Sequence, residues 1–585
     1  MPFNQETQSA GTVTRFDRAS YSDRERFTYM GTGSLGAKAH GLAGIKGVLE
    51  NKIAPLFKSA IQVDIPLLTV IATDFFDLFM EENSLFETVS CSLPDEQIVD
   101  AFQRAELPAQ LVLDLRAFVA QIRVPLAVRS SSLLEDAMDE PLAGVYATKM
   151  IPNNQSDPED RLRKLSDAIK YVYASTFLGK AAACLAATGH RSGDEKMAVI
   201  IQEAVGISRN DRFYPHVSGV ARSLNFYSLG LSRPEDGVVE LALGLGKTIV
   251  DDGIAWSFSP TYPHANPPYN TLLDLVKQTQ KEFWAIDMTE PGESRPRDET
   301  EHLKKYPLSD AERDGTLSFL ASTYKAEDEK VVMGITGHGP RILDFAQILK
   351  ADLVPLAALL KESLRTCEES LGTMVEIEFA LTFPDSGTLP ARFHFLQVRP
   401  MAVSQSRVEV HPEELTGNNV LVASESALGN GASASIRDVV YVKPQAFATR
   451  HTRPIGLQLE AINRRLLTEE CPYVLIGFGR WGSSDPAAGI PVNFGQISGA
   501  RVIVEATLPS VDFILSQGSH FFHNITSSKV LYFSVSHSGQ FRIDWEWLDR
   551  QRAVRETEFT RHVRLPSPLG IKVDGRTNRG VIFKE

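Results

Sequence analysis

The sequence of 585 residues has little cysteine and no long apolar run. Its four cysteines, Cys91, Cys184, Cys367 and Cys471, are far apart and form no CxxC pair. This argues against a disulfide framework or a cysteine zinc site and favours a reducing compartment. No apolar stretch approaches the roughly 20 residues that span a bilayer, and residues 1–29 are too polar for a secretory signal. We therefore expect a cytoplasmic protein with no membrane partner.

Positive charge is also scarce for a chain of this length. Lys and Arg total 60 against 73 Asp and Glu, which gives a net charge of −13. Affinity for a nucleic-acid backbone comes mainly from clustered positive charge, so we expect no nucleic-acid partner. A local basic pocket for a small phosphate remains compatible with this balance. The composition, 43% hydrophobic and 23% charged, is typical of a globular protein.

The pattern of the chain indicates two α/β units. Residues 1–28 are predicted to form a polar leader, and residues 29–405 a mixture of short buried strands and helices. Within this unit, residues 260–340 are rich in Pro, Glu, Lys and Asp and predict an irregular or partly helical insertion. A linker at 406–418 precedes a second, smaller α/β unit at 419–585.

Hydrophobic periodicity predicts individual elements in the first unit. Strands are expected at 63–71, 124–130, 197–203, 219–226 and 238–243. Helices are expected within 94–120, 157–187 and 342–371.

Two adjacent strands, predicted at 375–383 and 391–398, carry charge on one face. Side chains alternate along a strand, so Glu376 and Glu378 point away from the apolar face. The turn residues between the strands favour an antiparallel hairpin.

The register of this hairpin decides which polar groups meet. If Glu378 pairs with Gln397, Glu376 pairs with Arg399. Magnesium prefers oxygen ligands that it shares with substrate phosphates, and arginine binds phosphate oxygens. A sheet with one wet face and an ordinary cross-strand ion pair is the alternative.

Two further segments offer cations. The glycine-rich segment 33–42 carries Lys38 before a predicted helix and can bring backbone N–H groups and an ammonium toward a polyphosphate. It lacks the GxxxxGK[ST] pattern, and a glycine turn with an exposed lysine is the alternative. Arg129 ends an apolar strand and precedes Ser130–Ser132. The alternative interpretation is that these serines cap the N-terminus of a helix and that Arg129 is exposed to solvent.

Seven separated segments occur in an order that resembles the nucleotide-binding half of the phosphoenolpyruvate synthase and pyruvate phosphate dikinase family. They lie between residues 31 and 401 and read GAKAHGLA, VRSSSLLEDAMDEPLAGVY, IIQEAV, SGVARSLN, LGLGKTIVDDG, VEIEFAL and LQVRP. The resemblance implies an α/β (α+β) fold with a two-lobed ATP-grasp domain, in which a lid and a core clasp ATP.

The resemblance also implies roles for matching residues: Lys38, Arg129 and Arg399 for the ATP phosphates, Glu378 and Gln397 for Mg²⁺ on the polyphosphate, and Gln202 and Glu203 beside the adenine. Two residues depart from the family pattern. Glu376 replaces the usual aspartate, and Lys247 replaces the usual glutamate. The added positive charge of Lys247 could contact phosphate or signal altered turnover.

The C-terminal unit resembles the family less closely. Residues 420–440 are similar to the opening of its swivelling phosphohistidine domain, and residues 516–524 match the histidine motif only over Gly-Ser-His, which makes His520 a candidate relay. Ordinary histidines at 520 and 523 are the alternative. Too few residues follow His520 for the family's pyruvate-binding barrel of roughly 250 residues, so we do not expect pyruvate bound in cis.

The segment 477–486 is a second dense motif in this unit. Its glycines, Arg480 and two serines could cradle a phosphate or a carboxylated acceptor. A tight turn with a stacked tryptophan is equally compatible with the sequence.

Together these patterns predict an ATP-dependent, magnesium-requiring phosphotransferase of dikinase type. The acceptor, a small molecule or a partner protein, is not identified, and a homo-oligomer is left open. A regulatory or scaffold subunit that binds ATP without consuming it is one alternative. A direct kinase without a phosphohistidine is the other.

Overall fold

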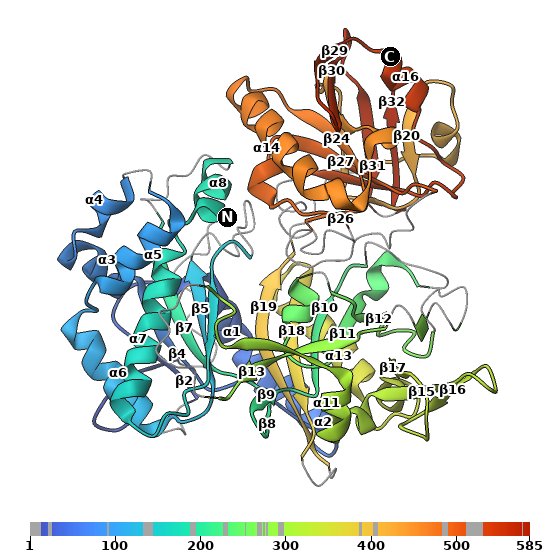
Figure 1. Cartoon of the computed structure of the whole chain (residues 1–585). Helices are drawn as coiled ribbons and strands as arrows, with labels where there is room; N and C mark the ends of the chain where they lie inside the picture. Colours follow the sequence, from blue (N-terminus) through green and yellow to red (C-terminus); the bar gives the residue numbers. More distant parts are fainter. Residues whose placement is uncertain are drawn as a thin grey trace.

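The structure is a computed structural model of the chain (Figure 1). It describes residues 13–21, 26–90, 93–132, 144–187, 195–225, 232–251, 253–265, 272, 275–276, 279–289, 298–384, 389–401, 408–482, 489–509, 530–575 and 577–584.

The first lobe is built on a six-stranded sheet with helices on its outer side (Figure 1). The strand order is β1 (Thr14–Arg15), β2 (Phe27–Met30), β4 (Leu68–Ile71), β7 (Met197–Glu203), β5 (Leu126–Ser132) and β6 (Thr148–Ile151). The helices include α3 (Thr73–Glu82), α5 (Asp95–Arg104), α6 (Ala109–Gln121) and α7 (Pro158–Ala174). Helix α7 begins where the Asp157 side chain accepts a hydrogen bond from the Glu159 N–H and Pro158 occupies the first turn.

The second lobe is built on another six-stranded sheet. Its order is β12 (Trp256–Phe258), β11 (Val238–Ala242), β10 (Val217–Arg222), β18 (Val375–Thr382), β19 (Ala391–Pro400) and β3 (Ile61–Asp64). Helix α13 (Leu356–Leu371) packs on β18 and β10. Helix α1 (Gly36–Val48) contacts both β5 and β19, so it joins the two lobes.

Two element predictions fail for the same reason, a proline that breaks the expected element. The strand expected at 63–71 is two strands, β3 and β4, which lie in different sheets on either side of Pro66. The helix expected at 342–371 starts only at Leu356, after Pro355. The residues before it form β17 (Arg341–Leu343) and the short α12 (Ala346–Leu349).

The insertion expected to be irregular is rich in strands. It contains β13 (Glu282–Asp287), β14 (Leu303–Pro307), α11 (Leu308–Arg313), β15 (Ala321–Lys325) and β16 (Lys330–Met333). Strands β13 and β14 extend a sheet with β9 (Arg212–Tyr214) and β8 (Ile207–Arg209). The charged residues lie on the exposed sides of these strands and mask their pattern.

The C-terminal unit has a mainly parallel centre. Its seven-stranded sheet has the order β21 (Ala427–Leu428), β28 (Leu531–Val535), β27 (Ala500–Ala506), β24 (Tyr473–Phe478), β23 (Asp438–Val442), β30 (Thr560–Arg564) and β29 (Ala553–Glu556). A second sheet has the order β20 (Val420–Ser424), β32 (Arg579–Phe583), β31 (Gly570–Asp574) and β22 (Gly431–Ser433). Helix α14 (Thr452–Thr468) packs with this unit (Figure 1).

The leader and the linker each contribute buried side chains, which their polar sequences did not predict. Phe16 and Tyr21 of the leader are buried in the core of the first lobe. Val410 and Leu415 of the linker are buried against Ala423 of the C-terminal unit. Among the helices that the structure describes, none has the length and apolar character that crossing a membrane requires.

Gly36 allows a test of the close contact between the start of α1 and Ser131 of β5. It has φ +75°, and a Cβ there would lie 1.6 Å from the Ser131 carbonyl oxygen. We expect Gly36→Ala to lower the midpoint of thermal unfolding by about 5 °C or more. Gly44 of the same helix has nothing within 4 Å of such a Cβ, so Gly44→Ala is the matched control and is expected to be neutral or stabilising by about 0.5–1 kcal/mol. Equal midpoints for the two variants would contradict this account.

Candidate functional site

The charged hairpin has the predicted register. In β18 and β19, Glu376 pairs with Arg399 and Glu378 pairs with Gln397. The face is not wet, because Glu376 is 2% exposed and Arg399 is 1% exposed. The ladder shifts after Glu378, which leaves Leu396 outside it as a β-bulge.

Arg129 connects the two lobes at this bulge. Its Nη2 donates to Glu378 Oε2 at 3.0 Å and to Gln397 Oε1 at 2.9 Å, and its Nη1 donates to the Leu396 carbonyl at 3.1 Å. The side chain is only 13% exposed, which rules against the solvent-exposed arginine that the sequence allowed. A cation from β5 and two oxygens from β18 and β19 therefore converge on one point.

A cavity of about 390 Å³ lies between the lobes. It is lined by every predicted nucleotide-site residue in the described part of the chain, namely Lys38, Arg129, Gln202, Glu203, Lys247, Glu378, Gln397 and Arg399. Residues scattered over more than 350 positions of the sequence thus meet in one place. His520 lies outside the described residues.

Lys38 is the contribution of the glycine-rich segment to the cavity. Its Nζ donates to Ser130 Oγ at 3.2 Å. The backbone N–H groups of the segment are used differently from the expectation. Those of Thr32 and Gly33 donate to the Asp74 carboxylate, and that of Ser34 donates to Thr73 Oγ1. Gly33 thus lies in a turn anchored on α3, and Lys38 is the residue of this segment that lines the cavity.

A row of alternating charges runs across the sheet beneath the cavity. Glu376 accepts from Arg399 and from Arg222 Nε, the latter at 2.6 Å, and Arg222 Nη1 donates to Glu240 at 2.8 Å. Burial acts to lower the pKa of Arg222, but the two carboxylates outweigh it and raise the pKa. Arg399 is therefore a cation whose orientation is set by Glu376.

The protonation state of Glu378 suits a metal site. Burial acts to raise the pKa of its carboxyl, but the charges of Arg129, Arg399 and Lys38 outweigh burial and hold the pKa below its usual range. Among the residues that the structure describes, no group of three or more His, Cys, Asp or Glu side chains could hold a metal. The carboxylate of Glu378 and the amide oxygen of Gln397 fit Mg²⁺, which commonly takes one or two protein ligands and completes its shell with phosphates and water.

At Gln202 and Glu203, where the resemblance implies the adenine, two backbone N–H groups are already used within the chain. The N–H groups of Glu203 and Ala204 already donate to the carbonyls of Leu67 and Pro125. Gln202 Nε2 is buried and has no acceptor among the described residues. Burial raises the pKa of the Glu203 carboxyl. Gln202 is therefore the group best suited to donate to a nucleotide base.

Lys247 begins the short α9 (Lys247–Val250) at the cavity wall. Its Nζ lies 3.0 Å from Asp251 Oδ2 and 5.6 Å from the centre of the Trp284 ring. Part of its charge is therefore balanced within the chain, so it does not simply add to the charges of Lys38, Arg129 and Arg399.

Sequence reasoning missed several residues that line the same cavity, among them Lys180, Asp251, Glu299, Leu303, Gly482, Val492, Asn493 and Phe494. Glu299 and Leu303 come from the insertion, where Lys149 of β6 forms a 2.6 Å ion pair with Glu301. Gly482 belongs to the dense motif at 477–486. Trp481 of that motif is buried in the C-terminal core, and residues 483–486 of the motif lie outside the described residues.

Comparison with protein-family models matches residues 32–418 to the pyruvate phosphate dikinase AMP/ATP-binding domain. The match covers about two thirds of the chain and ends where the C-terminal unit begins.

The buried charge row predicts that Glu376 matters for stability. Glu376→Gln removes the charge between Arg222 and Arg399, and we expect it to lower the free energy of unfolding by about 3–5 kcal/mol. Glu312 pairs with Arg341 at the surface, where its side chain is 36% exposed. Glu312→Gln is therefore the control and is expected to cost less than about 1 kcal/mol. Urea unfolding followed by circular dichroism measures both, and equal losses would show that the row is not stabilising.

Proposed function

Because this chain belongs to the pyruvate phosphate dikinase AMP/ATP-binding family, we propose that it transfers a phosphoryl group from magnesium-bound ATP in the cavity to a second substrate. Family membership supports an ATP-binding kinase or dikinase at the level of the family. The observation that carries the proposal is Arg129, which reaches from one lobe to the two metal-binding oxygens of the other.

Each lobe supplies one part of this chemistry. Lys38 and Arg129 bind the phosphates from the first-lobe side, and Arg399 provides positive charge from the second sheet. Glu378 and Gln397 hold Mg²⁺, which when bound neutralises phosphate charge. Transfer of a phosphoryl group depends mostly on positioning and charge neutralisation, so fixed cations and oxygens are what the reaction needs.

The route of the phosphoryl group has two forms. In the dikinase route, His520 takes the pyrophosphoryl group of ATP and AMP leaves. The terminal phosphate then passes to water or inorganic phosphate, and the phosphoryl group that stays on His520 passes to the acceptor. In the direct route, the acceptor takes it from ATP in the cavity.

A regulatory subunit that binds ATP without consuming it is the second candidate function. The pairing of Lys247 with Asp251 favours it, because the family's usual glutamate at that position has been replaced by an internally balanced cation.

The products distinguish these routes. Incubation with ATP, Mg²⁺ and candidate acceptors is expected to yield AMP, and chromatography of the nucleotides measures it. ADP instead of AMP would support the direct kinase, and unchanged ATP the regulatory subunit. With labelled ATP the dikinase route forms an acid-labile phospho-adduct that His520→Ala abolishes. Turnover that survives this substitution would exclude the relay.

Glu378 tests the metal site independently of turnover. Its lowered pKa keeps the carboxylate charged down to below the ordinary value of about 4.3. We therefore expect wild type to bind ATP with Mg²⁺ about tenfold or more tightly than Glu378→Gln, and this ratio of affinities, measured by titration calorimetry, to stay constant from about pH 8 to about pH 5. The ratio is the measure because the phosphates of ATP titrate near pH 6 in both experiments. A ratio near one, or a ratio that falls near pH 6, would contradict the assignment.

A further inference from the structure

Four residues of the C-terminal unit line the nucleotide cavity. Gly482, Val492, Asn493 and Phe494 share it with Arg129 and the metal-binding residues. All four lie beyond the part of the chain that matches the family. Part of the cavity wall is therefore particular to the C-terminal unit of this chain.

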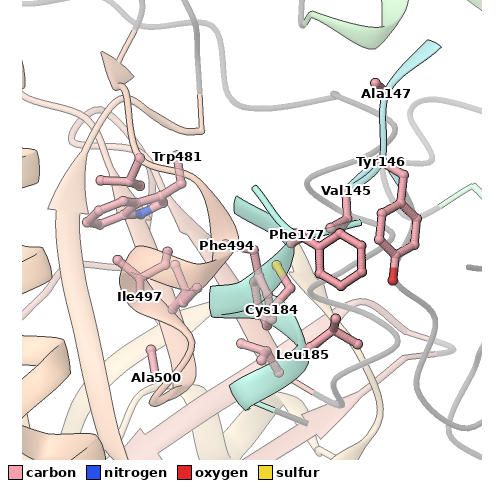
Figure 2. Close-up of a cluster of buried hydrophobic side chains, with 14 of the residues drawn as sticks. Val145, Tyr146, Ala147, Phe177, Cys184, Leu185, Trp481, Phe494, Ile497 and Ala500 are labelled. Carbon is pink, nitrogen blue, oxygen red and sulfur yellow. The ribbon is translucent and has the colours of Figure 1, made fainter. Parts of the chain in front are cut away.

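The C-terminal unit is attached beside the cavity through a close helix contact. Helix α8 (Gly179–Ala187) of the first lobe meets the 3₁₀ helix η8 (Phe494–Ile497), and Figure 2 shows Cys184 and Phe494 side by side. Cys184 is 2% exposed and Phe494 is 8% exposed. A Cβ added at Gly495 would lie 2.7 Å from the Ala183 Cβ. The glycine thus permits an approach that no other residue allows without a shift.

The N-terminus of η8, which lines the cavity, is fixed by hydrogen bonds of its capping residue Asn493. Asn493 Oδ1 accepts from the Gln496 N–H at 3.1 Å, and Gln496 Oε1 accepts from the Asn493 N–H at 2.8 Å. Gln496 Nε2 also donates to Glu460 of α14 at 2.9 Å. This reciprocal cap fixes Asn493 and Phe494 to the body of the C-terminal unit.

Helix α8 contributes to the cavity as well as to the contact. Lys180, in its first turn, lines the cavity and donates to the Gly144 carbonyl, and Gly144 lines the cavity too. A shift of α8 would therefore change both the lining of the cavity and the contact with η8.

The C-terminal unit also approaches the charged end of the second sheet. Burial is the main influence on Glu240 and raises its pKa, while Arg222 and, from the C-terminal unit, Arg480 act in the opposite direction. Arg480 lies two residues before the cavity-lining Gly482. The unit thus lies near the row of charges that orients Arg399.

We propose that the C-terminal unit, docked on α8 through Gly495, is a wall of the nucleotide site, and that nucleotide binding and docking stabilise each other. The proposal rests on the proposed function, because it assigns the ligand of the cavity as ATP. Linkage requires that whatever docking adds to ATP affinity, ATP adds to docking. In its docked position the C-terminal unit then raises the affinity of the cavity for nucleotide. A domain that served only as a mobile acceptor of the phosphoryl group would not do so.

A steric wedge at the contact tests this coupling without replacing a residue that lines the cavity. The backbone at Gly495 has no positive φ, so Gly495→Ala adds a clash with the Ala183 Cβ at 2.7 Å and an ordinary contact with Asn493 Oδ1 at 3.4 Å. We expect its affinity for a magnesium-bound, non-hydrolysable ATP analogue to fall about tenfold, within the usual range of coupling between sites. Combining it with Ala183→Gly removes the clashing atom and is expected to restore affinity to within about threefold of the Ala183→Gly single variant.

Gly431→Ala is the matched control in the same unit. A Cβ there meets only a Leu531 side-chain atom at 3.9 Å, so analogue affinity is expected to be unchanged. If wild type binds the analogue and Gly495→Ala binds it equally well, the wall proposal is wrong while the proposed function stands. If wild type binds no nucleotide, both are wrong.

Cys184 reports docking directly. Its thiol is buried at the contact, so its alkylation requires the contact to open. We expect the analogue to slow alkylation of Cys184 in wild type about tenfold, and Gly495→Ala to speed it in the absence of nucleotide. Peptide mass spectrometry separates Cys184 from the other cysteines. Alkylation that is insensitive to bound analogue would overturn the coupling.

Discussion

The site depends on one polar contact between the lobes, in which the guanidinium of Arg129 lies against Glu378 and Gln397. Three hydrogen-bond acceptors from β18 and β19 surround this group, including a carbonyl that the β-bulge at Leu396 leaves outside the ladder. A charged group buried between lobes is stabilised only when it is paired. The same requirement that holds the lobes together also gathers cations and oxygens where a polyphosphate can meet them.

Much of this site could be predicted from the sequence because strand geometry is periodic. Alternation placed Glu376 and Glu378 on one face, and pairing of Glu378 with Gln397 predicted the partner of Arg399 correctly. The β-bulge at Leu396 could not be predicted, because the residue types around it are the same as in a regular strand. The role of the glycine segment was also misjudged, because Asp74, which binds its N–H groups, lies 41 residues away from Gly33.

The failures in the fold have similar causes. Pro66 separates two strands that hydrophobicity alone joins into one, and the charged insertion hides strands whose exposed faces carry its lysines. For the cavity wall formed by the C-terminal unit, the sequence offered one indication, the dense motif at 477–486 that contains Gly482. Its other members are ordinary residues whose importance comes from where η8 meets α8 (Figure 2).

The central claim is that one triphosphate occupies the cavity between the lobes. A crystal structure with Mg²⁺ and a non-hydrolysable ATP analogue tests it most directly. The account predicts phosphate oxygens beside Lys38 and Arg129, and a metal ion bound by Glu378 and Gln397. A nucleotide bound elsewhere, or a metal ion away from these two side chains, would contradict it.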